Sequence, residues 1–170
     1  SSVKQTSSAA PKQPISSVST SSAPSNIAFI EPPAFVDIPG VIQAEHFNFA
    51  FDTDAQQNGD AACTNAVDTS VDSAKTTDAK GGNCHIGWTA ADETLGYAIE
   101  VSKAGKFDLL LRLSSLAAGK KIGVYLDNTQ IGTVTGPGKG WDAWRDVWLR
   151  GKNIAAGSHE LELRMIDRGV

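Results

Sequence analysis

The chain has 170 residues and a formal net charge of −4 at pH 7, from 15 basic and 19 acidic side chains. This length fits one globular domain with a tail and is too short for two domains of ordinary size. The acidic balance argues against nucleic acid or an anionic membrane as the partner, because both usually require an excess of lysine and arginine. No apolar run approaches the roughly 20 residues that cross a bilayer. We therefore expect a soluble protein, with any signal peptide removed or left out.

The first segment, residues 1–26, contains ten serines and three prolines but no acidic or aromatic residue. Such a segment cannot bury enough apolar surface to offset the entropy lost on ordering. It is predicted to be a disordered, flexible Ser-rich linker. An extended lead-in over 27–40 and the folded domain over 41–170 are expected to follow it.

Alternating apolar residues between turn signals predict β-strands and almost no helix in the rest of the chain. In chain order, the predicted strands span 41–47, 97–101, 107–113, 121–126, 130–135, 144–149 and 159–166. Residues 127–129 form a predicted hairpin turn between the fourth and fifth strands. Turn signals spaced roughly 8–12 residues apart are typical of an all-β sandwich or barrel.

The two cysteines, Cys63 and Cys84, lie in an acidic stretch over 45–93 that has nine acids and two lysines. Without a CxxC motif or histidines at ligand spacing, they cannot form a structural zinc site. We expect a disulfide that stabilises a long loop by about 3 kcal/mol, and with it an oxidising, extracytoplasmic compartment. The alternative is a pair of free buried thiols. The acidic stretch could hold a hard cation, although such runs are more often solvated loops.

Motifs for catalysis are missing from the sequence, which has no nucleophile elbow, P-loop or dinucleotide fingerprint. Asp92 and Glu93 are adjacent carboxylates, and neighbours on a strand point to opposite faces, so they cannot flank one glycosidic bond. Asp52-Thr53-Asp54 suggests the start of a calcium loop, but Gln56 and Gln57 follow where a ligand and a glycine belong. These observations predict a non-catalytic domain.

The tryptophans are the distinctive feature, because three of the four lie between 141 and 148. Trp141 follows the Gly-rich loop 135–140, and Trp88 follows a second one at 80–83. An exposed indole in a loop often marks a binding surface, and sugar rings present an apolar C–H face that stacks on indole. The alternative is that both indoles pack inward.

Seven short motifs occur in order between 41 and 170. They are Ile42-Gln43-Ala44-Glu45-His46-Phe47, GGNCHIGWTAAD over 81–92, Leu95-Gly96-Tyr97, AGKFDL over 104–109, Ile131-Gly132-Thr133-Val134, Gly140-Trp141-Asp142-Ala143-Trp144 and AAGSHEL over 155–161. With these motifs in this order, the chain resembles carbohydrate-binding module family 6. Members of this family are small modules appended to secreted polysaccharide-degrading enzymes. The resemblance implies a jelly-roll β-sandwich with a ligand cleft formed by loops at one edge.

By this resemblance, Trp88 and Trp141 are the two aromatics that clasp a sugar ring, and Trp144 is a core residue. The implied function is non-catalytic binding of a polysaccharide or oligosaccharide, which targets a secreted polysaccharide-active protein to its glycan. Nucleic acid and membranes are not expected as partners. Further domains are expected in the full-length protein.

The resemblance also implies a structural calcium ion, Ca²⁺, held by Glu45 with help from Gln43, where the family more often has glutamate. Family members continue into one more strand, which carries an asparagine for the sugar and an acid near the calcium. That strand is expected to begin at Asp167-Arg168-Gly169-Val170, so the cleft and metal site would be incomplete and one sheet edge unpaired.

Two other functions remain open. A protein-binding or adhesion domain could use Trp148 and Arg145 as a hot spot. A small glycan-active enzyme of the same class could use Asp68, Asp72 and Asp78. The sequence does not name the sugar, because stacking recognises the face of a ring rather than its hydroxyls.

Overall fold

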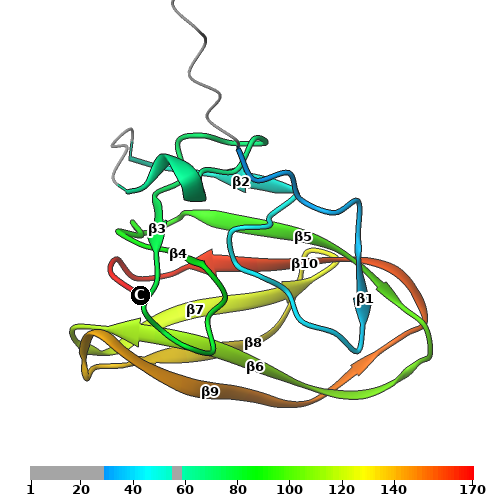
Figure 1. Ribbon diagram of the computed structural model, residues 1–170. Helices are drawn as coiled ribbons and strands as arrows, with labels where there is room; N and C mark the ends of the chain where they lie inside the picture. Colours follow the sequence, from blue (N-terminus) through cyan, green and yellow to red (C-terminus); the bar gives the residue numbers. More distant parts are fainter. Residues whose placement is uncertain (1–28, 55–58) are drawn as a thin grey trace, which may run out of the picture.

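The computed structural model describes residues 29–54 and 59–170, so the predicted linker, residues 1–26, lies outside the described residues. The described residues form ten β-strands and one 3-10 turn, η1 (Ala61–Cys63), and no α-helix (Figure 1). The strands are β1 (Val36–Ile38), β2 (Phe49–Phe51), β3 (Ser73–Lys75), β4 (Cys84–Ile86), β5 (Thr94–Val101), β6 (Gly105–Ser115), β7 (Ala118–Leu126), β8 (Thr129–Pro137), β9 (Gly140–Ile154) and β10 (Gly157–Met165). No helix in this part of the chain is long and apolar enough to span a membrane. The predicted all-β class is confirmed.

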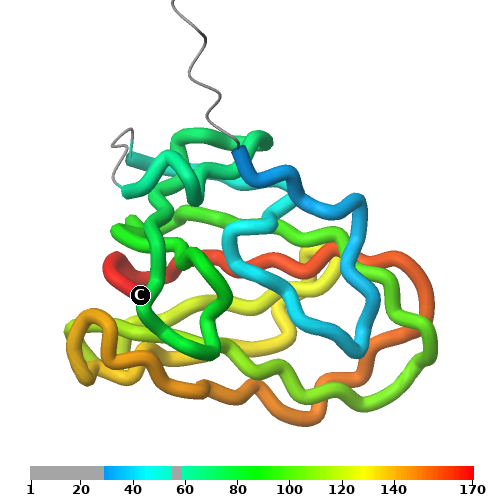
Figure 2. The backbone as a smooth tube through the Cα atoms, in the orientation of Figure 1, coloured from blue at the N-terminus to red at the C-terminus, as the bar shows by residue number. Residues whose placement is uncertain are grey.

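The strands form a sandwich of two layers. One layer is a six-stranded sheet with the order β1-β5-β10-β7-β8, in which β2 also pairs with β5. The other layer is the β6–β9 pair, and β3–β4 is a separate two-stranded sheet. In Figures 1 and 2, β6 and β9 form the lower layer beneath the larger sheet. The second layer therefore has fewer strands than the first.

The core lies between the layers and follows the period of two that a strand imposes. On β5, Tyr97, Ile99 and Val101 are buried, and β7 and β10 add Val124 and Met165. The opposite layer is less well covered: the inward leucines of β6, at 109, 111 and 113, are only partly buried. The two layers thus enclose the core unequally.

Six of the seven predicted strands correspond to β5 to β10 and are confirmed, most of them in longer form, although the predicted strand 159–166 runs one residue past the end of β10. The turn between β7 and β8 is confirmed as well. Asp127 (φ 47°) and Asn128 (φ 62°) both occupy the left-handed region. Aspartate and asparagine tolerate this region better than most residues, and a two-residue hairpin turn of this type requires it.

The predicted strand over 41–47 is wrong. The N–H of His46 donates to the carbonyl of Gln43 (3.0 Å), which makes a turn instead. The side-chain amide of Asn65 then donates to the carbonyls of Glu45 (2.7 Å) and Phe47 (3.0 Å). The apolar alternation in this segment is real, but a distant asparagine supplies the hydrogen bonds that a neighbouring strand would otherwise make.

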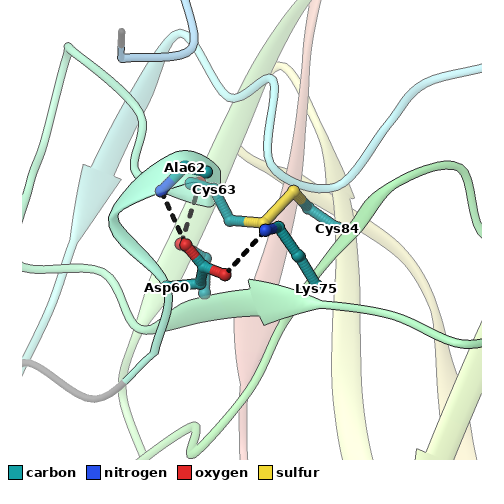
Figure 3. Close-up of a disulfide and its surroundings, with 6 residues drawn as sticks. Asp60, Ala62, Cys63, Lys75 and Cys84 are labelled. Atoms are coloured by element: carbon teal, nitrogen blue, oxygen red, sulfur yellow. Dashed lines mark hydrogen bonds and ion pairs between the residues drawn. A yellow bond between two sulfur atoms is a disulfide. The ribbon is translucent and has the colours of Figure 1, made fainter. Parts of the chain in front are cut away.

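The predicted disulfide between Cys63 and Cys84 is confirmed, and both residues are buried (Figure 3). It joins η1 to β4. Asp60 caps η1 by accepting from the N–H of Ala62 (2.9 Å) and pairs with Lys75 Nζ (3.3 Å), as Figure 3 shows. The disulfide fixes the long loop after β2 to the short β3–β4 hairpin.

Replacing both cysteines with alanine is expected to lower the free energy of unfolding by about 3 kcal/mol, because the open chain then gains loop entropy. Urea denaturation measures this loss, and Lys75→Ala is the control because it breaks only an exposed ion pair beside the disulfide. The denatured, unreduced protein is expected to contain no free thiol. A double variant as stable as the parent, or two titratable thiols per chain, would contradict this prediction.

Candidate functional site

An open cavity of about 1370 Å³ lies between the layers. It is bordered by β4, by β6 from residue 107 to residue 114, and by the irregular segment 38–45. Trp88 and Trp141 both line it, and their side chains are 51% and 53% exposed. The structure therefore brings the two sequence-predicted tryptophans to one cavity and leaves both indoles open to solvent.

Trp88 follows β4 and has a φ of 50°, which is unusual for a large side chain. Its ring is stacked against His85, with the ring centroids 6.4 Å apart and the planes at 23°. Backbone strain of this kind costs about 1–3 kcal/mol and is often found at binding sites. The positive φ turns the chain sharply here, and the indole stays half exposed.

Trp141 was expected to precede a strand, but it lies inside β9, one residue after the strand begins. Two residues with positive φ flank it, Gly140 (110°) and Asp142 (62°). The pairing of β9 with β6 shifts register beside it, between Leu113 and Ser115. Because the strand starts irregularly, the Trp141 side chain does not follow the regular alternation of side chains between the two faces of β9.

Gly169, near the C-terminal end of the described chain, connects the two tryptophan segments. Its N–H donates to the carbonyl of Thr89 (2.9 Å), the residue after Trp88. A methyl group on Gly169 would lie 3.4 Å from Cη2 of Trp141. Such a methyl group would make only ordinary van der Waals contact with the indole, and it is the φ of 81° at this position that favours glycine.

His85 and Trp144 lie behind the exposed pair. Their rings meet edge to face, with centroids 5.3 Å apart. Neither His85 Nδ1 nor Trp144 Nε1, both buried, has a hydrogen-bond partner among the described residues. Burial lowers the pKa of the His85 imidazole, which favours the neutral ring. Trp144 was expected in the core and is only partly buried, because it borders the open cavity.

The residues predicted to hold calcium, Gln43 and Glu45, also line the cavity. Glu45 is 4% exposed, burial raises its pKa, and its Oε2 has no hydrogen-bond partner in the described part of the chain. The carboxamide of Gln43 lies over Gly82, where a Cβ would come within 2.7 Å of Oε1. An unpartnered buried carboxylate oxygen with a carboxamide on the same segment fits the oxygen ligands that calcium prefers.

A second acidic group, which the sequence did not predict, consists of Asp52, Asp54 and Glu93. One carboxylate oxygen from each residue lies within 4.8 Å of the others, so this group could hold a metal ion. Arg168 donates to Asp54 Oδ2 (2.8 Å). The Asp52-Thr53-Asp54 pattern hinted at this site, but the third carboxylate comes from a residue 39 positions further along the chain.

Glu93 makes stability depend on pH. Burial, together with the nearby carboxyls of Asp52 and Asp54, raises its pKa to about 8, from an ordinary value of 4.5. The folded state therefore keeps a proton that the unfolded state releases, and this contribution to stability is lost as pH rises from about 5 through 8. In EDTA, the melting temperature of Glu93→Gln is expected to fall less over this range than that of the parent.

The control for this measurement is Glu31→Gln, which removes an exposed carboxyl elsewhere on the chain. Its melting temperature is expected to follow the parent at every pH. Equal slopes for the parent and for Glu93→Gln would show that Glu93 does not hold the proton.

The residues suggested for an enzyme site are not assembled. Asp68, Asp72 and Asp78 do not form a cluster of the kind found at Asp52, Asp54 and Glu93 among the described residues. Asp78 accepts two hydrogen bonds from Arg112 (2.6 and 2.9 Å), and this contact lowers its pKa. Asp78 is therefore a charged partner of Arg112.

The two residues of the predicted hot spot, Trp148 and Arg145, make contacts with other residues. Trp148 is 46% exposed, and the guanidinium of Arg150 lies 4.4 Å from its ring centroid. Arg145 instead donates to the carbonyl of Trp144 (2.8 Å). Trp148 thus contacts a different arginine from the one expected.

Residues 61–169 match the sequence profile of the family described as carbohydrate binding module (family 6). No curated protein matches the chain significantly. Among solved structures, the chain is similar to CsCBM6-3 from Clostridium stercorarium, in complex with cellobiose, with 19% identity and a TM-score of 0.59 over 79% of this chain and 90% of that one. It is also similar to a β-1,3-glucan binding family 6 module from Bacillus halodurans, with 20% identity and a TM-score of 0.57 over 77% and 86%.

A third similar structure belongs to a larger protein. It is a glycoside hydrolase family 43 arabinoxylan arabinofuranohydrolase from Bacillus subtilis, in complex with cellotetraose. Identity is 18% and the TM-score is 0.61, over 81% of this chain but only 26% of that one. These similarities confirm the predicted jelly-roll sandwich.

Proposed function

The chain belongs to family 6 of the carbohydrate-binding modules, a family of non-catalytic binding modules, and on this premise we propose that it binds its glycan with Trp88 and Trp141. The observation that supports these residues most is that both indoles are half exposed and line one cavity. Each indole offers an apolar face for the C–H groups of a sugar ring.

The glycan is proposed to be a polysaccharide or an oligosaccharide of several sugar rings. The structure of CsCBM6-3 is a complex with cellobiose, and the Bacillus halodurans module is described as β-1,3-glucan binding. Oligosaccharides of these two kinds are therefore the first ligands to test. Titration with cello-oligosaccharides or laminari-oligosaccharides is expected to change the tryptophan fluorescence in a saturable way. A signal that stays flat for both series would contradict binding of these glucans.

We also propose that the module directs a secreted polysaccharide-active protein to its substrate, with residues 1–26 as the linker to further domains. The Cys63–Cys84 disulfide supports an oxidising compartment. The Bacillus subtilis hydrolase supports the arrangement, because the similar region makes up about a quarter of that chain. Detection of the protein in cells but not in culture medium would contradict secretion.

Glu45 and Gln43 are proposed to hold a structural calcium ion, and the unpartnered Oε2 of Glu45 supports this pair. The ion would supply positive charge to a buried carboxylate, which otherwise destabilises the fold. Because an ion that binds only the folded state stabilises it by mass action, saturating calcium at about 100 times its Kd is expected to add about 2.7 kcal/mol. EGTA is then expected to lower the melting temperature.

Two variants separate this site from the acidic group at 52, 54 and 93. Glu45→Gln is expected to abolish the effect of EGTA, whereas Glu93→Gln is expected to retain it. Differential scanning calorimetry with and without EGTA measures both. The proposed pair would be wrong if EGTA has no effect on the parent, or if Glu93→Gln abolishes the effect and Glu45→Gln does not.

A further inference from the structure

Trp148 is a third half-exposed tryptophan that lines the cavity, together with Trp88 and Trp141. It lies on β9, seven residues after Trp141. Exposed aromatic side chains are not gathered there in general. Of the described phenylalanines, the exposed ones lie away from the cavity, and they are Phe29, Phe35 and Phe51. The exposed indoles are therefore concentrated at one place on the molecule.

Trp148 and Leu110 form an apolar pair on the outer face of the β6–β9 layer. They lie directly opposite each other in the strand register, and their side chains are 46% and 48% exposed. The neighbouring residues Leu109 and Leu149 pack in the core, so the alternation of a strand directs Leu110 and Trp148 to the other face. Both side chains line the same cavity as Trp141. The cavity therefore extends from Trp141 to the outer face of this layer.

The Trp148 indole is held in place by a short series of contacts. The guanidinium carbon of Arg150 lies 4.4 Å from its ring centroid. Arg150 Nη1 in turn donates to Asp108 Oδ2 (3.0 Å), and the N–H of Gly151 donates to Asp108 Oδ1 (2.7 Å). A side chain whose orientation is fixed before binding loses less conformational entropy when a ligand arrives. The indole is thus half exposed and already oriented.

Polar side chains that line the cavity lie between Trp148 and Trp141. Arg112, two residues after Leu110 on β6, donates to Asp146 on β9 (2.8 Å). Lys80 Nζ lies 3.5 Å from the same carboxylate, and the side chains of Lys80 and Asp146 are both partly exposed to solvent. Guanidinium, ammonium and carboxylate groups can all form hydrogen bonds with hydroxyls. The surface therefore alternates between apolar and hydrogen-bonding groups, as the faces and hydroxyls of a glycan do.

The spacing of the tryptophans determines the size of a ligand that could contact both ends. A strand rises about 3.3 Å per residue, so the seven residues from Trp141 to Trp148 span roughly 20 Å. Residues 107–114 of β6 line the cavity along this distance. A disaccharide is too short to contact both indoles, whereas an oligosaccharide of several rings is long enough.

We propose that Trp148 and Leu110 form a distal contact for the glycan, so that the module binds long chains more tightly than short oligosaccharides. This inference rests on the proposed function of Trp88 and Trp141, which bind the same chain at its other end. A sugar ring would place its C–H face on Leu110 and on the part of the indole that Arg150 leaves exposed. Hydroxyls of the intervening rings would bond to the polar side chains between the two ends.

Isothermal titration calorimetry with cello-oligosaccharides and laminari-oligosaccharides of two to six rings tests this inference. In the series that the parent binds, its affinity is expected to rise at least about tenfold from the disaccharide to the hexasaccharide. Trp148→Ala is expected to lose this gain and to keep the parent's affinity for the disaccharide. Trp148→Phe keeps an aromatic ring and is expected to retain part of the gain.

Phe51→Ala is the control, because it removes an exposed aromatic ring that does not line the cavity, and it is expected to match the parent at both lengths. If Trp148→Ala binds the hexasaccharide as tightly as the parent does, the distal contact is overturned and Trp88 and Trp141 keep their role. An equal loss for both lengths would also overturn it, because Trp148 would then act through the fold. If the parent binds neither series, the proposed binding of these glucans fails together with the distal contact.

Discussion

The Trp141→Ala variant is expected to bind its glycan about ten- to a hundredfold more weakly than the parent protein, with almost the same melting temperature. The indole is 53% exposed, so its removal leaves no buried cavity. Stacking on an aromatic platform is expected to contribute about 1–3 kcal/mol, and each 1.4 kcal/mol corresponds to a tenfold change in Kd. Isothermal titration calorimetry gives the affinity, and thermal melting gives the stability.

Phe51→Ala is the matched control, because it removes an exposed aromatic ring (61% exposed) that does not line the cavity. It is expected to bind with the affinity of the parent. A Trp141→Ala protein that binds normally, or that melts well below the parent, would show that Trp141 has a packing role instead of a binding role.

The Trp144→Ala variant is expected to have the opposite effect, with a free energy of unfolding lower by about 3 kcal/mol and nearly unchanged glycan affinity. Its ring packs edge to face on His85 and is partly buried, so truncation removes this contact and the apolar area that it buries. Urea denaturation measures the loss, and Trp144→Phe is expected to recover part of it by keeping the ring contact.

If Trp144→Ala unfolds at the same urea concentration as the parent, Trp144 does not pack in the core. If it loses affinity while keeping its stability, the binding surface extends behind Trp88 and Trp141. Either result would contradict the assignment of Trp144 to packing and of Trp88 and Trp141 to glycan binding.

Local patterns in the sequence were enough to predict the strands whose partners are close in the chain. The β7–β8 hairpin follows from two alternating runs around Asp127 and Asn128, and the buried face of β5 follows from its apolar alternation. For the segment 41–47, local patterns gave a wrong prediction. Its alternation resembles that of a strand, but Asn65 satisfies its backbone, and no local pattern reveals a partner about 20 residues away.

The candidate site was predictable to a different degree for each group. Trp88 and Trp141 were proposed from their Gly-rich loops and the family resemblance, and the structure then showed both of them exposed at one cavity. The cluster of Asp52, Asp54 and Glu93 depends on strand pairing that brings distant residues together, so spacing along the chain could not reveal it.

Affinity electrophoresis tests the central claim most directly. The parent, Phe51→Ala and the double variant Trp88→Ala/Trp141→Ala are run in native gels that contain hydroxyethylcellulose, a soluble β-1,3-glucan or arabinoxylan. The parent and Phe51→Ala are expected to be retarded equally in at least one gel, and the double variant is expected to migrate as it does without polysaccharide. Free migration of the parent in all three gels, or undiminished retardation of the double variant, would contradict carbohydrate binding by these two tryptophans.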